Sequence, residues 1–510
     1  MKKTLEKIYP NKLFLLVYIT LFTSIALTGF LIGNNAGQFG DQYHMLTSGR
    51  EIIENPSFLY NNTLFCKEGY GNLIQQWLYD ILLYGSYSVL GWTGVRLFTL
   101  IQYILLAVLT YRFMRLTGIT RKTACIGTLA FPIFSYSYIS CRPEMISVCL
   151  LLIQCIIIEK YRNDQKPARL YILPVLMLIE MNIHMTFWIF HFVLLLPYLV
   201  PIKILHIKNN SIRIKQLILP VLLMAAALFV NPYREKGILI LWYSRNITKA
   251  PIDEIKPIEI FSLHTFFLAL GLFMIIVAFQ NKRLSSTTVF VFFGTAFMYA
   301  MMSRNMIFYA IGVMYAFRDA TTDANTAAYW NYFENLAKSR KKYAISVACA
   351  LCYIVLMVSM YTYRQKTERT IYKEPTAALE YLKQNEDTKQ IKMYVNMNIG
   401  AYMTWNNIGH IYLEGKTEPY LKEINGHKDI VMEYVYMRNT TDGNDIQAFL
   451  DEYDFDYLFV DFLDHSIGAY LTNNSDYECV VEHKSTESGK TDPTGTKDEY
   501  VLWRLYKHIR

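Results

Sequence analysis

"LFLLVYITLFTSIALTGFLI", residues 13–32, contains no charged residue and follows Lys2, Lys3, Lys7 and Lys12. A helix that crosses a bilayer needs about 20 largely apolar residues, so this stretch alone is long enough. A signal peptide is the alternative, but the run is long for one and no clear small-x-small cleavage site follows it. We therefore predict an uncleaved first transmembrane span with the N-terminus in the cytoplasm.

The composition of the whole chain agrees with a membrane protein. The 510 residues are 53% hydrophobic and 18% charged, whereas soluble domains contain about 25% charged residues. The net charge of +8 comes from bases in short connections between apolar runs. This pattern indicates membrane topology, and we expect no nucleic-acid partner because the bases do not cluster on a soluble face.

Further apolar runs extend the prediction to about eleven spans in an α-helical polytopic membrane protein. The additional runs are 94–114, 122–140, 143–159, 170–182, 184–201, 215–231, 260–280, 286–302, 305–318 and 343–362. Alternating their direction places every strongly basic connection on the cytoplasmic side, as the positive-inside rule requires. These connections are 112–122, 160–169, 203–215, 282–283 and 318–342.

Residues 72–91 are apolar enough to be mistaken for another span. Their apolar positions recur at helical spacing, however, with Gln75, Gln76 and Asp80 on another face. This pattern predicts an amphipathic helix at the membrane interface. We therefore place it in a first external loop, 33–93, and we expect a second large external loop at 231–257.

Beyond residue 362 the chain becomes polar. The residues 374–385 have a helical pattern, and the stretches 391–397, 410–415 and 453–462 resemble strands. This alternation predicts a small extracytoplasmic α/β domain at 363–510, after a transmembrane domain at 1–362.

Several polar residues are predicted to lie on the outer side of the membrane. A carboxylate or an imidazole can act as a general base, and the planar fork of arginine matches phosphate oxygens. The candidates are Asp41, His44, Arg142, Asn182, His184, Arg245 and Arg304.

Each candidate also has a structural interpretation. Asp41 could be a solvated loop acid, and Arg142 and Arg304 could be anchors at the lipid headgroups. His184 lies four residues from Glu180, which favours a structural pair.

The metal and thiol patterns are weak. Asp454 and Asp456 have the spacing of a DxD motif, but strand alternation turns both outward. Cys349 and Cys352 lie inside a predicted span, where cysteine behaves as a small hydrophobic residue. A disulfide between the external Cys66 and Cys141 stays open. The sequence names no cofactor, and a divalent metal is left open.

The chain lacks a Walker loop, a GxGxxG after a strand, HExxH and paired CxxC motifs. No sizeable cytoplasmic segment could bind a nucleotide sugar. Chemistry is therefore expected at the outer face.

The first external loop, from "GDQYHMLTSG" (40–49) through "GWTGVRLF" (91–98), resembles that of bacterial polytopic proteins related to the GT-C glycosyltransferases. The elements "CRPEM" (141–145), "EMNIHMTF" (180–187), "NPY" (231–233), "SRNMIFYAI" (303–311) and "IYLEGKTEPY" (411–420) resemble later parts of that family. The last has Glu414 and Lys416 where the family element has Asp and Arg.

The resemblance implies transfer of a sugar from a polyprenyl-phosphate or polyprenyl-diphosphate donor to a glycan, lipid or protein acceptor of the bacterial cell envelope. Asp41 would be the catalytic base, in an inverting reaction. Arg142 and Arg304 would hold the lipid phosphate, and His44 would shape the loop or contact the phosphate. The alternatives are a non-catalytic accessory protein of envelope glycan assembly and a transporter of lipid-linked glycans.

Overall fold

The computed structural model describes residues 41–121, 123–125, 127–128, 141–199, 207, 212–245, 257–259, 262–321, 347–348, 351–352, 355, 375–461, 464–485 and 500–509. The chain divides into two compact units. The helical unit comprises 1–35, 89–238 and 252–366, and the mixed unit comprises 36–88, 239–251 and 367–510. The predicted domain boundary at residue 362 lies outside the described residues and stays a prediction.

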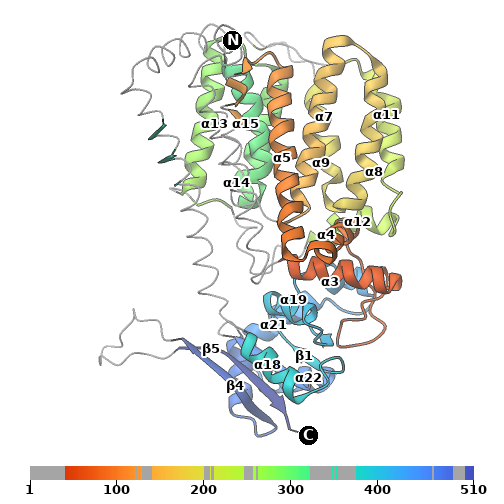
Figure 1. The fold of residues 1–510 in the computed structure, drawn as a ribbon, viewed down its shortest axis with the longest axis vertical. Helices are drawn as coiled ribbons and strands as arrows, with labels where there is room; N and C mark the ends of the chain where they lie inside the picture. The colour runs from red at the N-terminus through yellow and green to blue at the C-terminus, as the bar shows by residue number, and fades with distance from the viewer. Residues whose placement is uncertain are drawn as a thin grey trace, which may run out of the picture. The chain divides into compact units, whose positions relative to one another are not determined.

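The helical unit is a bundle of apolar helices (Figure 1). Its elements are α5 (Trp92–Leu116), α7 (Glu144–Asp164), η3 (Pro167–Ile172), α8 (Leu173–Ile183), η4 (Met185–Phe187), α9 (Trp188–Val193), α10 (Leu196–Leu199), α11 (Ile214–Ala227), α13 (Leu263–Gln280), α14 (Ser286–Met301), η7 (Ser303–Asn305) and α15 (Met306–Ala320). The helix α12 (Glu235–Tyr243) begins in this unit and ends in the mixed unit.

Among the described residues, two helices are long and apolar enough to cross a membrane, α5 and α13. They match the predicted spans 94–114 and 260–280 closely. Shorter apolar helices cover Met185–Leu199, Ile214–Ala227 and Ser286–Met301. The predicted spans 13–32, 122–140 and 343–362 lie wholly or mostly outside the described residues. The count of eleven spans is therefore not confirmed and stays a prediction.

The run 170–201 is interrupted where the prediction divides it, between the spans 170–182 and 184–201. His184 has an extended backbone, with φ −158° and ψ 82°, and this ends α8 after only 11 residues. The chain continues as η4, α9 and α10, which follow one another within the apolar helical stretch Met185–Leu199. The run also contains buried polar side chains, among them Glu180, His184 and His191, whose contacts are described below.

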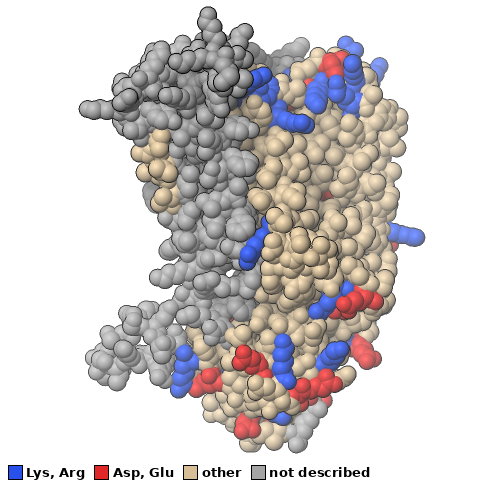
Figure 2. All heavy atoms as spheres, in the orientation of Figure 1, with Lys and Arg blue, Asp and Glu red and all other residues tan. Residues whose placement is uncertain are grey.

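Basic side chains lie near the helix ends on one side of the bundle. Arg318, close to the end of α15, contacts Glu159 of α7 at 3.3 Å and Asp319 at 2.7 Å. It also donates to Ser285 Oγ at 2.7 Å, where α14 begins. Figure 2 shows Lys and Arg gathered at the upper end of this face of the bundle, above a broad surface with few charges.

The mixed unit contains a five-stranded sheet of order β2-β1-β3-β5-β4. The strands are β1 (Lys392–Tyr394), β2 (His410–Ile411), β3 (Tyr457–Asp461), β4 (Tyr477–Ser485) and β5 (Tyr500–His508). The pairs β1–β2 and β1–β3 are parallel, and β3–β5 and β4–β5 are antiparallel. The predicted strands are present but shorter than expected, and β4 and β5 are not anticipated by the sequence patterns.

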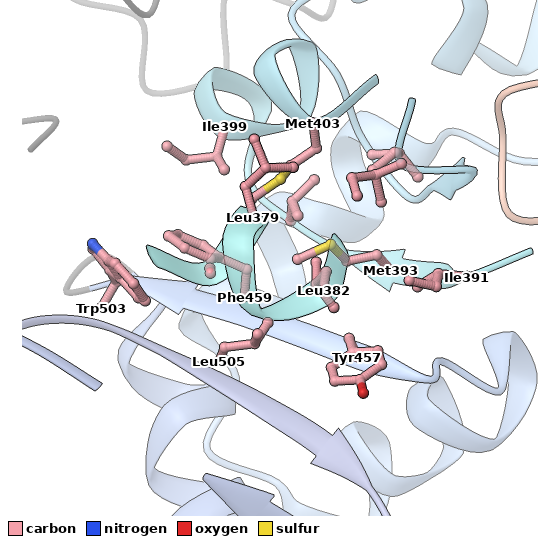
Figure 3. Close-up of a cluster of buried hydrophobic side chains, with 14 residues drawn as sticks. Leu379, Leu382, Ile391, Met393, Ile399, Met403, Tyr457, Phe459, Trp503 and Leu505 are labelled. Atoms are coloured by element: carbon pink, nitrogen blue, oxygen red, sulfur yellow. The ribbon is translucent and has the colours of Figure 1, made fainter. Parts of the chain in front are cut away.

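The helices of this unit are α3 (Asp41–Glu54), η2 (Pro56–Leu59), α4 (Trp77–Leu90), α18 (Thr376–Asn385), α19 (Met397–Trp405), η8 (Glu418–Tyr420), α20 (Lys422–Asn425), α21 (Ile430–Asn439), α22 (Gly443–Tyr453) and α23 (His465–Thr472). The predicted helix at 374–385 is α18. It places Leu379 and Leu382 against Met393 and Phe459 of the sheet, where they form a buried core (Figure 3).

The residues of the first external loop pack onto this sheet. Phe65 forms a β-bridge with Ile411 of β2, and the Ile411 amide donates to Leu64 O at 2.8 Å. Nearby, the Gly71 amide donates to Asn425 O at 3.2 Å. Farther along the same surface, Lys67 pairs with Glu452 at 2.6 Å. The loop and the C-terminal residues therefore share one folding unit, although about 350–390 residues separate the contacting partners in sequence.

The predicted amphipathic helix is α4, which begins at Trp77. Its inward face buries Tyr79, Asp80 and Leu83 completely. Its outward face exposes apolar side chains, including Leu82 at 45% and Val89 at 78%. The polar Asp80 thus faces the protein and the apolar face points away from it, as expected of a helix that lies against lipid.

Candidate functional site

Asp41 stands at the start of α3, where the backbone amides of a first helical turn are not yet paired within the helix. The positive end of the helix dipole favours a carboxylate at this position. From Tyr43 to Gly49 every residue is buried. The half-buried Asp41 is therefore held at the edge of a rigid helix rather than on a free loop.

His44 lies one turn farther along α3 and is 5% exposed. Its Nε2 lies 3.2 Å from Nε2 of Gln76, directly before α4. On its other side the ring packs against Gly415, where an added Cβ would lie 3.0 Å from His44 Nδ1. Three segments that are far apart in sequence thus fix the orientation of this imidazole.

Gly415 is flanked by a buried ion pair. Lys416 Nζ lies 2.9 Å from Glu414 Oε1, and the two side chains are 3% and 1% exposed. The Glu414 amide donates to Tyr420 Oη at 3.2 Å, and Lys416 lies over the ring of Phe58 at 5.2 Å. Because a buried ion pair is costly to break, the turn that contacts His44 is held firmly.

Asp80 lies near this pair and is fully buried. Neither of its carboxylate oxygens has a hydrogen-bond partner among the described residues. Burial raises the pKa of the Asp80 carboxyl well above its usual range, against the opposing effect of the Lys416 charge. The side chain is therefore expected to hold its proton to a higher pH than an exposed aspartate does.

In the helical unit, three predicted residues gather around Glu144 in the first turn of α7. Arg304 Nη2 lies 3.4 Å from Glu144 Oε1. Arg142 and His184 also interact electrostatically with the Glu144 carboxylate. These four side chains come from the start of α7, the end of α8 and the turn η7 between α14 and α15.

His184 also belongs to a buried polar network. Ser147 Oγ donates to Glu180 Oε1 at 2.6 Å and lies 3.3 Å from His184 Nδ1. The second oxygen of Glu180 lies 3.1 Å from His191 Nε2, and His191 Nδ1 lies 2.6 Å from Gln154 Oε1. Glu180 and His184 therefore share Ser147, and the direct partner of the Glu180 carboxylate is His191 rather than the His184 that their spacing suggests.

The remaining predicted residues lie apart from the Glu144 cluster. Asn182 donates to Leu178 O at 2.8 Å and to Val230 O at 2.9 Å, so it fastens α8 to the end of α11. Arg245 is exposed and lies 4.9 Å from the ring of Trp242. Asp41 and His44 belong to the mixed unit, and Arg142, His184 and Arg304 belong to the helical unit.

Sequence reasoning did not single out Glu144, Asp80 or the contact of Gln76 with His44. Glu144 directly follows Arg142 and Pro143, so its position beside a candidate residue could have identified it as part of the site. Its partner Arg304 is 160 residues away, and no local pattern links the two.

Among the described residues, no group of three or more His, Cys, Asp or Glu side chains is arranged to hold a metal ion. The residues present therefore do not make a recognisable metal centre. Asp454 is exposed, and Asp456 accepts from the Lys392 amide at 2.8 Å. Within the same ranges no disulfide joins Cys66 to Cys141, and Cys349 lies outside them.

No protein-family model and no curated protein matches the chain. Solved structures do match. The apo oligosaccharyltransferase of Archaeoglobus fulgidus superposes with a TM-score of 0.61 at 10% identity, covering 97% of this chain and 75% of that chain. The chain therefore shares the fold of that enzyme, which is GT-C-like. The same archaeal enzyme, AglB, in complex with an inhibitory peptide and a dolichol-phosphate gives a TM-score of 0.60 at 9% identity over 95% and 74% of the two chains.

A third structure of that enzyme, tethered to an acceptor peptide containing the NVT sequon, gives 0.57 at 9% identity over 94% and 74%. At these identities the likeness establishes the GT-C-like fold of this chain. It confirms the fold family implied by the sequence resemblance, while the reaction is a separate question.

Proposed function

We propose that this protein is an integral membrane glycosyltransferase that moves a sugar from a polyprenyl-(di)phosphate donor to a cell-envelope acceptor. The observation that carries the proposal is the GT-C-like fold over nearly the whole chain, shared with an enzyme solved in complex with dolichol-phosphate. The arginines around Glu144 add support, because the guanidinium fork binds phosphate oxygens through two hydrogen bonds.

In the proposed mechanism Asp41 is the base. Its carboxylate accepts the proton of the acceptor hydroxyl while the hydroxyl oxygen attacks the anomeric carbon of the donor. The bond from that carbon to the phosphate oxygen breaks, and the configuration inverts. Arg142 and Arg304 bind the leaving phosphate as negative charge develops on it. His44 orients the helix that carries Asp41, and no step is routed through a metal.

We place the chain in a bacterial cell membrane with the N-terminus in the cytoplasm and the mixed unit outside. The gathering of Arg and Lys at one end of the helical bundle supports this orientation. The exposed Cys479 of β4 offers a direct test. In intact cells a membrane-impermeant maleimide should label the wild type but label the Cys479→Ser variant less. Equal labelling of the two in cells, with a difference appearing only after lysis, would place the mixed unit inside.

The decisive experiment supplies a labelled polyprenyl-phosphate sugar to the purified protein in liposomes. Transfer by the wild type and its loss in Asp41→Asn are expected. Asp454→Asn is the matched control, because that acid is exposed and its positive φ of 48° suits asparagine. Equal transfer by wild type and Asp41→Asn would exclude Asp41 as the base. Movement of the donor across the bilayer without transfer would favour a transporter.

A further inference from the structure

Glu144 is an acidic residue beside the arginines that are proposed to bind a phosphate. Its carboxylate is 12% exposed and interacts electrostatically with Arg142, His184 and Arg304. A negative charge at this point repels the anion that the two arginines are proposed to bind. We therefore expect Glu144 to have a role that offsets this repulsion.

The two oxygens of Glu144 are used unequally. Oε1 contacts Arg304 Nη2 at 3.4 Å. Oε2 is buried and has no hydrogen-bond partner among the described residues. Burying a carboxylate oxygen without a hydrogen-bond partner costs free energy. The contact between Glu144 and Arg304 therefore leaves Glu144 incompletely satisfied.

Arg304 is able to leave this contact. Its side chain is 39% exposed, in a short 3₁₀ turn between two helices. Among the described residues its one ion pair is the long contact with Glu144. A phosphate, with its higher charge and its geometry suited to both nitrogens of the guanidinium fork, is a stronger partner than one carboxylate oxygen at 3.4 Å.

We propose that Glu144 is an internal counterion that holds Arg304 when no lipid phosphate is bound and competes with that phosphate for it. The inference rests on the proposed function, since it assigns a role within the same phosphate site. Binding of the lipid phosphate requires Arg304 to exchange Glu144 for the phosphate, and the return of Arg304 to Glu144 helps the product lipid phosphate to leave. Glu144 acts through Arg304 and is a positioning residue.

Competition between Glu144 and the lipid phosphate for Arg304 weakens the binding of the lipid phosphate. The apparent dissociation constant for the lipid phosphate equals the intrinsic constant divided by the fraction of protein in which Arg304 is available. Removing the charge of Glu144 increases that fraction. The lipid phosphate should then bind more tightly, and its release should be slower.

The test measures binding of a polyprenyl phosphate without sugar to the full chain in nanodiscs. We expect Glu144→Gln to lower its Kd by about two- to fivefold, the range for a partly exposed ion pair. In transfer assays KM for the donor and kcat should both fall, because release slows. Glu235→Gln, which removes an exposed acid at the start of α12, is the control and should match the wild type.

Unchanged or weaker binding by Glu144→Gln, with an unchanged Tm, overturns the inference and leaves the proposed function intact. Absence of polyprenyl-phosphate binding by the wild type overturns the proposed donor class, and the inference with it. If Glu144→Gln does not fold, Glu144→Asp provides the second test. Its carboxylate keeps the charge but is one methylene farther from Arg304, so binding should tighten by a smaller factor, and no tightening overturns the inference.

Discussion

Gly415 lies directly against the imidazole of His44. A Cβ added at Gly415 would be 3.0 Å from His44 Nδ1 and 3.7 Å from Cγ. The first distance is shorter than the ~3.5–4.0 Å of ordinary van der Waals contact, so the ring would have to move. The C-terminal segment thus sets the position of the helix turn that carries Asp41.

Gly415→Ala should therefore reduce stability by about 1 kcal/mol, the lower end for overpacking, because the methyl group meets a side chain rather than backbone. Sugar transfer should fall more than stability does, since the His44 ring shifts beside Asp41. Thermal unfolding and transfer assays on the same preparations measure the two effects.

Gly85→Ala is the matched control. Gly85 lies inside α4, and a Cβ there would meet nothing within 4 Å. Alanine should stabilise that helix by about 0.5–1 kcal/mol. If Gly415→Ala is as active and as stable as this control, the proposed coupling between residue 415 and His44 is wrong.

The helical unit shows what sequence can predict in this chain. The helices α5 and α13 were predicted within three residues of their observed ends, because long apolar runs identify them without knowledge of their neighbours. The division of 170–201 into two stretches was predicted, but the succession of η4, α9 and α10 within the second stretch was not. His184 and His191 bond to residues of α7, and such long-range polar contacts leave no periodic signal.

In the mixed unit, too, the structure that depends on long-range contacts could not be predicted from local sequence patterns. The short strands β1 and β3 follow recognisable apolar runs, whereas β4 contains Glu478, Glu482 and Lys484 and has two register shifts. Edge strands of this kind look polar and irregular in sequence. The pairing of the first external loop with the sheet depends on contacts such as Phe65 with Ile411, which only the folded chain reveals.

Asp464 should make the stability of the mixed unit depend on pH. Burial, followed by the charge of Asp461, raises the pKa of Asp464 from 3.8 to about 8, against the opposing charge of Arg438. The folded protein then holds a proton that the unfolded chain releases between about pH 4 and pH 8. Stability is consequently expected to fall as the pH rises through that window.

Asp464→Asn should flatten this dependence and raise Tm at pH 8 relative to the wild type. Part of the slope should remain, because Asp80 has a raised pKa and contributes with the same sign. Thermal unfolding from pH 5 to pH 9 measures both effects. A wild-type Tm that increases between pH 5 and pH 8, or an identical slope in the variant, would contradict the assignment.

The pair of Glu180 and His191 should be structural. Both side chains are 0% exposed, so neither can touch a substrate, and their contact at 3.1 Å joins α8 to α9. His191→Ala leaves Glu180 Oε2 and Gln154 Oε1 buried without this ring. The expected loss is about 1–3 kcal/mol, the cost of leaving a buried polar group without its hydrogen-bond partner. Glu180→Gln keeps an amide oxygen and nitrogen in place and should cost less.

The two changes should not be additive. Once Glu180 has lost its charge, removing His191 leaves no buried carboxylate without its partner, so the double variant should be more stable than the sum of the single losses predicts. Chemical or thermal unfolding of the four proteins in detergent gives this coupling energy. Transfer activity per folded molecule should be preserved in Glu180→Gln. A large loss of activity at unchanged Tm would instead assign the network to the reaction, as a relay from His184 and the Glu144 cluster.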